Sequence, residues 1–239
     1  PIRKICSVCN RTSKDSTLTI AAGKQEAKKD NVYNQMAQVL MGYNQDGAIQ
    51  KFDEDGDLTT TGDKLDDVAF LSFSRLLTKD EIKKGSFELE MGVTTAYATD
   101  GSVFGDTIKI LDFGADTSYK VNSPAGEYGI LYATSSTGAP LDTTSTHTAS
   151  LSDGNTYWKA GLIYYQAGVA VLTSSVFMGA SEGGFLNDGN AIWDGSSNSF
   201  TGSIENDEIS GSANGLRNRL YNLQFNNTIE LNSTVYFCR

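Results

Sequence analysis

The chain has 239 residues, which is enough for one large β domain or two small ones with a sizeable buried core. It carries 29 acidic and 19 basic residues, a net charge of −10. This balance argues against binding to nucleic acid or to an anionic membrane, because both attract clustered Lys and Arg. The sequence also lacks a run of about 18 apolar residues, so it predicts no membrane-spanning helix.

The chain has three cysteines, Cys6, Cys9 and Cys238. This small, odd number does not fit the paired disulfide framework of a secreted protein. Cys6 and Cys9 have C-x-x-C spacing, but a zinc site would need two further ligands. The chain offers only Cys238 and His147 for that purpose. We therefore expect buried or idle thiols, in a protein that assembles in a reducing cytoplasm.

One amphipathic helix is expected near the N-terminus, over residues 31–41. Asp30 would cap it, and Gly42 stands where a helix-ending glycine belongs. Its apolar residues recur at helical spacing and predict one face docked on a sheet. They are Val32, Met36, Val39 and Leu40.

The next stretch, residues 43–67, holds seven aspartates and a glutamate around two Asp-Gly pairs. An EF-hand loop needs carboxylates at positions 1, 3 and 5, Gly at 6 and Glu at 12. With Gly56 at position 6, Lys51 falls at position 1 and Gly62 at position 12, so the template fails. The favoured interpretation is two turns, at 45–47 and 54–56, around a short strand 48–52.

An alternative for the same stretch stays open. Asp53, Asp55 and Asp57 alternate along the chain and could converge on a calcium ion. If they do, we expect the metal to stiffen an assembly contact rather than to perform chemistry.

Residues 68–91 predict a strand, a short helical turn and a second strand. The run 68–77 is dense in apolar residues, as in a strand covered on both faces. Thr78 and Glu81 form a capping box, which predicts a helical turn ending at Gly85. After it, Phe87, Leu89 and Met91 alternate strictly and should face one side.

The remainder reads as short strands separated by turns. Strand-like runs cover 107–113, 126–134 and a hairpin at 161–177. Six Asp-Gly pairs supply the turn residues that such hairpins need. We expect a mainly β fold, an antiparallel sandwich or barrel-like domain with one helix and one capped turn.

Two regions are expected along the chain. Residues 1–66 would form an N-terminal arm, helix and acidic turn region, and residues 67–239 a β-rich domain. A Gly/Ser/Asn-rich stretch near 178–215 predicts a long loop. The strand-like pattern that runs up to Cys238 suggests that the natural chain continues beyond Arg239.

Nothing in the sequence indicates catalysis. His147 stands alone in a Ser/Thr-rich loop with no acid or nucleophile beside it in the sequence, so we expect a solvated side chain. No phosphate-binding or metallohydrolase motif is present. The sequence thus predicts no catalytic residue, no bound cofactor and no metal site, and a protein that is not an enzyme.

Four segments resemble parts of large virion structural proteins of tailed bacteriophages that infect aquatic bacteria. The resemblance extends from about Val68 to Arg239. The segments are AFLSFSRLLTKDEIKKGSFEL, DFGADTSYKVNSPAGEYGILY, AGLIYYQAGVAVLTSSVF and LNSTVYFCR.

The resemblance implies a structural component of the virion, of the tail or baseplate, that holds neighbouring subunits through β edges and loops. Its partners would be copies of itself and other virion proteins. One alternative is a receptor- or glycan-binding tip module, with Tyr157, Trp158 and Trp193 as candidate contacts, although packing is the favoured role for these aromatics. A second is a capsid or neck accessory protein, and a third is a polysaccharide-degrading enzyme on the particle.

Overall fold

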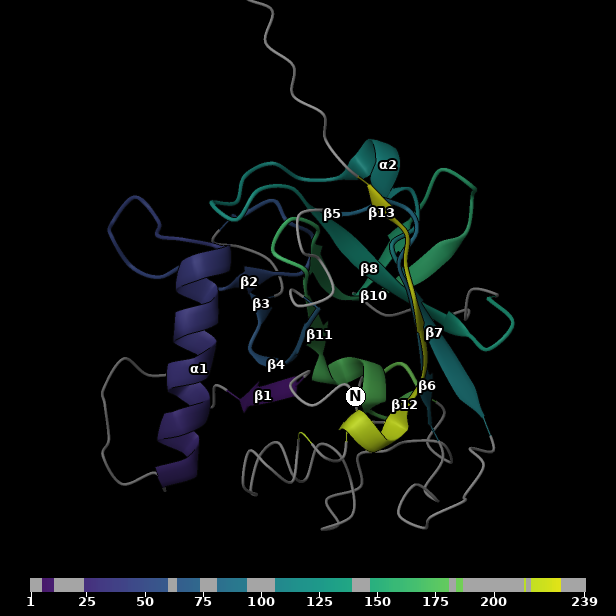
Figure 1. The fold of residues 1–239 in the computed structure, drawn as a ribbon, viewed down its shortest axis with the longest axis horizontal. Helices are drawn as coiled ribbons and strands as arrows, with labels where there is room; N and C mark the ends of the chain where they lie inside the picture. The colour runs from purple at the N-terminus through teal and green to yellow at the C-terminus, as the bar shows by residue number, and fades with distance from the viewer. Residues whose placement is uncertain are drawn as a thin grey trace, which may run out of the picture.

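A computed structural model shows how these segments are arranged (Figure 1). It describes residues 6–10, 24–59, 64–73, 81–93, 106–138, 147–180, 184–186, 213 and 216–228.

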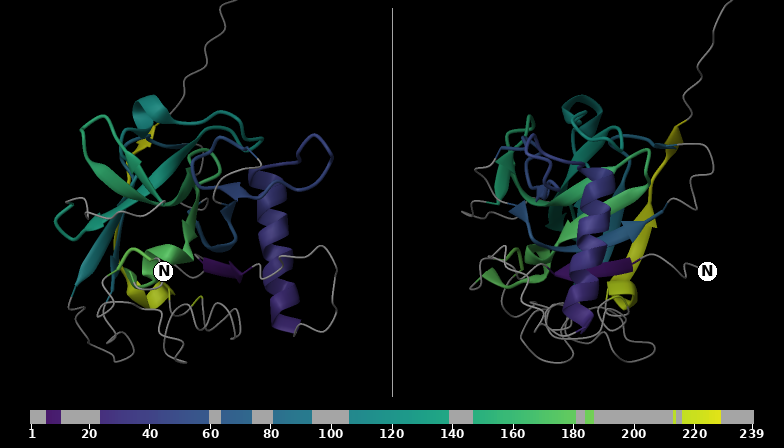
Figure 2. Two further views of the ribbon diagram at one scale, coloured as in Figure 1. Left: turned by 180° about the vertical axis from the view of Figure 1, so that it is seen from behind. Right: turned by 90° about the vertical axis from the view of Figure 1, so that its left-hand side faces the viewer.

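The fold is mainly β, as predicted, and its centre is one curled, barrel-like antiparallel sheet of nine strands (Figures 1 and 2). Eight of the strands follow the order β1-β4-β11-β10-β8-β7-β6-β12, and β9 pairs with β10. The strands are β1 (Cys6–Asn10), β4 (Asp67–Ser72), β6 (Glu88–Gly92), β7 (Thr107–Leu111), β8 (Tyr128–Ser135), β9 (Thr148–Ser150), β10 (Thr156–Tyr164), β11 (Val169–Thr173) and β12 (Leu220–Gln224).

Smaller elements surround this sheet. Two short antiparallel pairs join β2 (Phe52–Asp53) to β3 (Lys64–Leu65) and β5 (Glu81–Ile82) to β13 (Asn227–Thr228). The helical elements are α1 (Lys24–Leu40), α2 (Ala115–Ser118) and the 3-10 helix η1 (Ser174–Phe177). In Figure 1 and in the left view of Figure 2, α1 stands at one side of the molecule beside β1, and in the right view of Figure 2 it lies in front.

Strand β4 is buried on both faces, which confirms the prediction from its dense apolar run. Ala69 and Leu71 belong to one core cluster, whereas Val68 and Phe70 belong to the other. Successive residues of a strand point to opposite faces, so one strand supplies both cores. The central strand β10 does the same, through Ile163 on one side and its neighbour Leu162 on the other.

The two cores have different walls. The first lies among the strands of the curled sheet and includes Leu89, Ile110 and Trp158. The second lies between the sheet and a cover made of α1 and the β2–β3 pair. Tyr33 of α1 and Phe52 of β2 form part of that cover, and their rings meet edge to face with centroids 5.4 Å apart.

The helix differs from its prediction in two respects. It begins at Lys24, so Asp30 lies inside it and does not cap it. Its buried face is formed by Tyr33, Ala37 and Leu40, whereas Val39 is 65% exposed. The prediction counted aliphatic residues and left out Tyr33, whose hydroxyl donates to the Leu65 carbonyl oxygen and lets the ring be buried. Gly42 does end the helix, at φ 80°.

The predicted helical turn at 78–85 is wrong where the structure describes it. Glu81 and Ile82 form strand β5, paired with Thr228 and Asn227. The Ile82 amide donates to the carbonyl oxygen of Tyr165, and its side chain is fully buried. Long-range pairing and burial therefore override a local capping signal. The alternation at Phe87, Leu89 and Met91 is confirmed, since all three are buried.

Other predictions are confirmed in part or concern residues outside the described ranges. The predicted hairpin at 161–177 is confirmed as β10 and β11 up to Thr173, whereas its last four residues form η1 instead of strand. The turns at Gly47 and Gly56 have positive φ. Most of the predicted loop at 178–215 and the last strand-like run lie outside the described residues. The second core contains residues from both sides of the expected boundary at 66/67, among them Leu65 and Val68.

Gly161 marks the point where β10 meets β8 with a shift in register. Its φ is 145°, and a Cβ there would overlap the Val171 carbonyl oxygen. We predict that Gly161→Ala lowers the free energy of unfolding by about 3 kcal/mol or more. Chemical denaturation of both proteins measures this.

The matched control is Gly154→Ala. Gly154 also has a positive φ, 83°, but a Cβ there would meet nothing within 4 Å. We expect a loss of about 1 to 2 kcal/mol from the backbone conformation alone. Equal losses at both positions would contradict the steric explanation.

Candidate functional site

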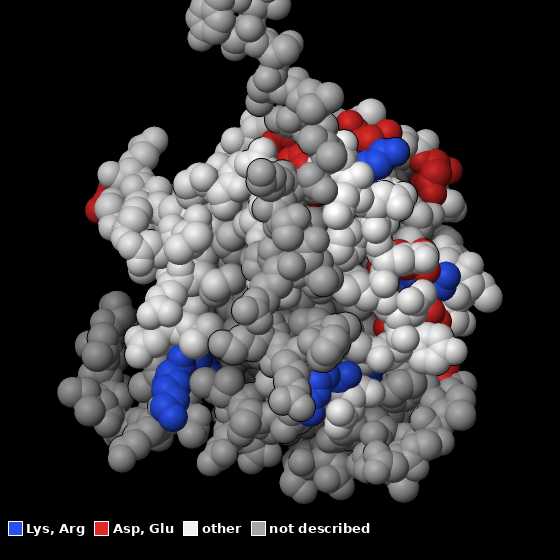
Figure 3. All heavy atoms as spheres, viewed as in Figure 1, with Lys and Arg blue, Asp and Glu red and all other residues white. Residues whose placement is uncertain are grey.

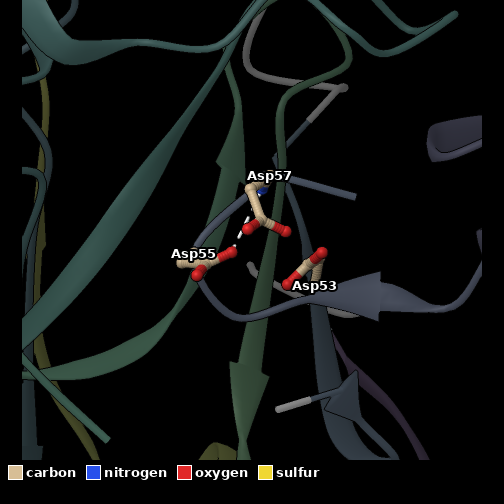
Figure 4. Close-up of side chains that lie close together, drawn as sticks. All are labelled: Asp53, Asp55 and Asp57. Carbon is tan, nitrogen blue, oxygen red and sulfur yellow. Dashed lines mark hydrogen bonds between the residues drawn. The ribbon is translucent and has the colours of Figure 1, made fainter. Parts of the chain in front are cut away.

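The acidic turn, residues 53–59, follows β2 and is the main candidate site. One carboxylate oxygen from each of Asp53, Asp55 and Asp57 lies within 4.8 Å of the other two. Figure 4 shows the three side chains directed toward one another. Their convergence, left open by the sequence, is therefore observed in the structure.

Backbone hydrogen bonds shape the acidic turn. The Asp57 amide donates to Asp55 Oδ1 at 3.1 Å, and the Leu58 amide donates to Asp53 Oδ2 at 2.8 Å. The Thr59 amide and hydroxyl donate to Asp57 Oδ1, at 2.8 and 2.9 Å. Gly56 and Leu58 both have positive φ, 70° and 59°. Aspartate favours such local bonds, which explains the density of Asp in this segment.

The acidic turn is also fastened to the sheet. The side-chain amide of Asn122 donates to the Gly56 carbonyl oxygen at 3.0 Å, and the Tyr128 hydroxyl donates to Asn122 Oδ1 at 2.7 Å. Phe52 and Leu65, which flank the turn, are both buried in the second core. The position of the three carboxylates is thus set by packing as well as by the turn itself.

The carboxylates differ in their surroundings. Asp53 is 1% exposed, and burial raises the pKa of its carboxyl group, while the hydrogen bond from Lys64 opposes the shift. Asp57 is exposed, and the hydrogen bond from the Thr59 amide lowers its pKa. Burial, followed by the charge of Asp53, raises the pKa of the nearby Tyr128 hydroxyl to about 12.

The structure changes the comparison with an EF-hand loop. Counting from Asp53, the three aspartates occupy positions 1, 3 and 5, and Leu58, at positive φ, occupies position 6. The EF-hand template therefore aligns with Asp53 at position 1, and the alignment with Gly56 at position 6 is wrong. The loop still does not match an EF-hand, because position 12 is Lys64 and the flanking elements are strands β2 and β3. Carboxylate oxygens in this arrangement are the ligand type that Ca²⁺ takes.

A second cluster forms around Glu54, which the sequence did not single out. Its carboxylate is almost fully buried and pairs with His147 Nδ1 at 2.9 Å and Lys159 Nζ at 3.4 Å. The His147 ring lies 5.4 Å from the ring of Trp158. The expectation of a solvated His147 is therefore wrong. Its acidic partner lies 93 positions away in the sequence, where no local motif could reveal it.

Asp112, at the end of β7, is a third buried carboxylate that the sequence did not single out. It accepts the Gly85 amide at 2.8 Å, the Phe87 amide at 2.9 Å and the Tyr165 hydroxyl at 3.2 Å. Burial nevertheless raises its pKa to about 6. These bonds tie the turn before β6 to the end of β7, which is a structural role.

The structure places the remaining candidate residues of the sequence analysis as follows. Tyr157 and Trp158 are buried, which confirms packing as their role, whereas Trp193 and Cys238 lie outside the described residues. Cys6 and Cys9 belong to β1, paired with β4. No described helix is both long and apolar enough to cross a membrane.

Charge on the face seen in Figure 3 is mixed. Acidic and basic side chains adjoin one another along the right-hand side of that view. Ion pairs of this kind include Lys109 with Glu88 at 2.8 Å, between β7 and β6. Among the residues that the structure describes, this face therefore presents no extended basic patch of the kind that nucleic acid needs.

Comparisons with known proteins give no match. No family model fits the chain, and neither the curated proteins nor the solved structures include a similar one.

The Glu54 cluster generates a prediction. In a double-mutant cycle with Glu54→Gln and His147→Gln, we expect a coupling free energy of about 1 to 3 kcal/mol. The reason is that a buried carboxylate depends on its hydrogen-bonding partners, and His147 Nδ1 lies 2.9 Å from Glu54 Oε2. Denaturation of the four proteins measures it.

The control is the exposed pair of Lys51 and Asp66, joined at 2.7 Å. Its cycle should give about 0 to 1 kcal/mol. A Glu54–His147 coupling as small as this would contradict the assignment.

Asp112 generates a pH prediction. Between about pH 4 and pH 6 the folded chain holds the Asp112 proton more tightly than the unfolded chain does. Raising the pH through this window therefore lowers the free energy of unfolding. Asp112→Asn removes the titration. Between pH 4 and pH 7, its stability relative to the wild type should improve by up to about 3 kcal/mol.

Urea denaturation across this pH range provides the measurement, with Asp116→Asn, on the exposed surface of α2, as the control. Parallel stability profiles for the wild type and Asp112→Asn would show that burial does not control this carboxyl group.

Proposed function

We propose that the chain is a structural component of a tailed-phage virion, of the tail or baseplate, that holds neighbouring subunits through sheet edges and loops. The resemblance supports this proposal. Three of its four segments fall in large part on described structure. They span β4 to β6, α2 to β8, and β10 to η1, and so form the centre of the curled sheet.

The physical observation that carries the proposal is the edge strand β12. It pairs with β6 on one side, and on its other side it pairs with no strand among those described. Its sequence, LYNLQ, has no charge and no proline, and Tyr221 is 62% exposed. Soluble monomers usually protect such edges with charges or proline, whereas assemblies use them for pairing between chains.

The described chemistry is also consistent with a non-enzymatic role in an assembly. Glu54 and His147 form a carboxylate–histidine pair, but a buried carboxylate shared with Lys159 is explained by charge compensation. Asp112 is occupied by three donors from the neighbouring turn and from Tyr165. Both groups connect segments that are distant in sequence, which suits a subunit that holds its neighbours in register.

The proposal predicts that the chain is a multi-copy, symmetric part of the phage particle. Mass spectrometry of purified particles should find it at a fixed ratio to the major capsid protein. Cryo-electron microscopy should place it in the tail or baseplate with β12 at a contact between subunits. Its absence from purified particles would contradict the proposal, as would its isolation as a monomeric enzyme.

The glycan-binding alternative is less favoured, because Tyr157 and Trp158 are both buried and cannot stack on a sugar. Of the three candidate aromatics, only Trp193 is not placed by the described residues. A glycan array with the purified chain separates the two functions: specific hits lost in Trp193→Ala would favour the tip module.

A further inference from the structure

A lysine lies beside the acidic turn and pairs with one of its three carboxylates. Lys64 of β3 pairs across the strand with Asp53 of β2, and its Nζ lies 2.6 Å from Asp53 Oδ2. The Lys64 side chain is 21% exposed and that of Asp53 is 1% exposed. The ammonium thus reaches the most buried of the three carboxylates.

The position of Lys64 in the loop can be compared with that of a metal ligand in an EF-hand. Counting from Asp53, Lys64 is residue 12, where an EF-hand loop has the glutamate that completes the metal's ligands. Here the same position carries a positive charge in place of a ligand. Because the β2–β3 pairing sets Lys64 directly opposite Asp53, the contact is fixed by backbone register as well as by side-chain reach.

Charge balance requires a cation at this point. Three carboxylates within 4.8 Å of one another repel, and a buried carboxylate is costly without a partner. Two other lysines near the turn are engaged elsewhere, Lys51 with Asp66 and Lys159 with Glu54, and the side chain of a third, Lys120, lies against Gly56. In the part of the chain that the structure describes, the ion pair made to these three aspartates is the one from Lys64 to Asp53.

We propose that Lys64 is the resident cation of the acidic turn: its ammonium stands in for a divalent metal, so the native turn folds without one. The inference rests on no part of the virion proposal. It answers the question that the aspartates raise in the sequence, since they converge as in a metal loop while the loop carries its own counter-charge. It also predicts that removing the ammonium converts the turn into a calcium site.

The test is calcium binding by the wild type and by Lys64→Glu, with CaCl₂ as the ligand. Lys64→Glu removes the cation and introduces a carboxylate at position 12. It should bind Ca²⁺ with a Kd of about 10⁻⁴ to 10⁻³ M by calorimetry, as in weak natural modules. Its melting temperature should rise by about 5 °C between EDTA and saturating CaCl₂. The wild type should show no heat of binding and no shift.

Two variants keep the test decisive. Lys51→Glu makes the same charge change one residue before β2, at a lysine paired with Asp66, and should not respond to Ca²⁺. Lys64→Gln removes the ammonium without adding a carboxylate. It should melt below the wild type in EDTA and recover part of the loss in CaCl₂, which gives an answer even if Lys64→Glu fails to fold.

The outcomes are distinct. Calcium dependence confined to the Lys64 variants supports the proposal. It is overturned if the wild type gains as much stability from CaCl₂ as Lys64→Glu does, because a metal then occupies the native turn. It is also overturned if neither Lys64 variant responds to Ca²⁺.

Discussion

The burial of both faces of the central strands is the constraint on which the rest of the structure depends. Strands β4, β10 and β11 carry apolar residues on each side, so the sheet needs two covers. The sheet provides one by curling, which brings β6, β7 and β12 around the first core. A separate layer must provide the other, and that layer is α1 with the β2–β3 pair.

The acidic turn exists because of this second cover. Phe52 and Leu65 have to reach the core, and the chain must reverse direction between them because β2 and β3 are antiparallel. Aspartates and glycine form that reversal through local hydrogen bonds, and they bring three carboxylates together as a consequence. The need for a counter-charge follows, and the pairing of β2 with β3 places Lys64 where it can supply one. Local turn chemistry and tertiary packing thus jointly produce what resembles a metal site.

Sequence reasoning succeeded where the signal is periodic and local. It predicted the β class, the double burial of β4, the alternation in β6 and the hairpin of β10 and β11. It failed where a distant partner decides. The capping box at Thr78 and Glu81 predicted a helical turn, but Glu81 and Ile82 form β5 and pair with β13. The buried face of α1 was expected to include Val39, which is exposed, and it includes Tyr33 instead.

The candidate sites show the same limit more sharply. The three aspartates are adjacent in sequence and could be identified, although their register required the positive φ of Leu58. Lys64 is only 11 positions from Asp53, but nothing in the sequence shows that it faces that carboxylate. The Glu54–His147 pair spans 93 positions, and Asp112 accepts amides some 25 positions earlier in the chain. Contacts of this kind depend on strand register, which one sequence does not define.

An ammonium, and not a metal, balances the acidic turn, and a high-resolution crystal structure of the wild type grown with calcium would test this. It should show Lys64 Nζ within hydrogen-bond distance of Asp53 and no anomalous scatterer among the three aspartates. A calcium ion held by Asp53, Asp55 and Asp57 at about 2.3 to 2.6 Å, with Lys64 turned away, would contradict it.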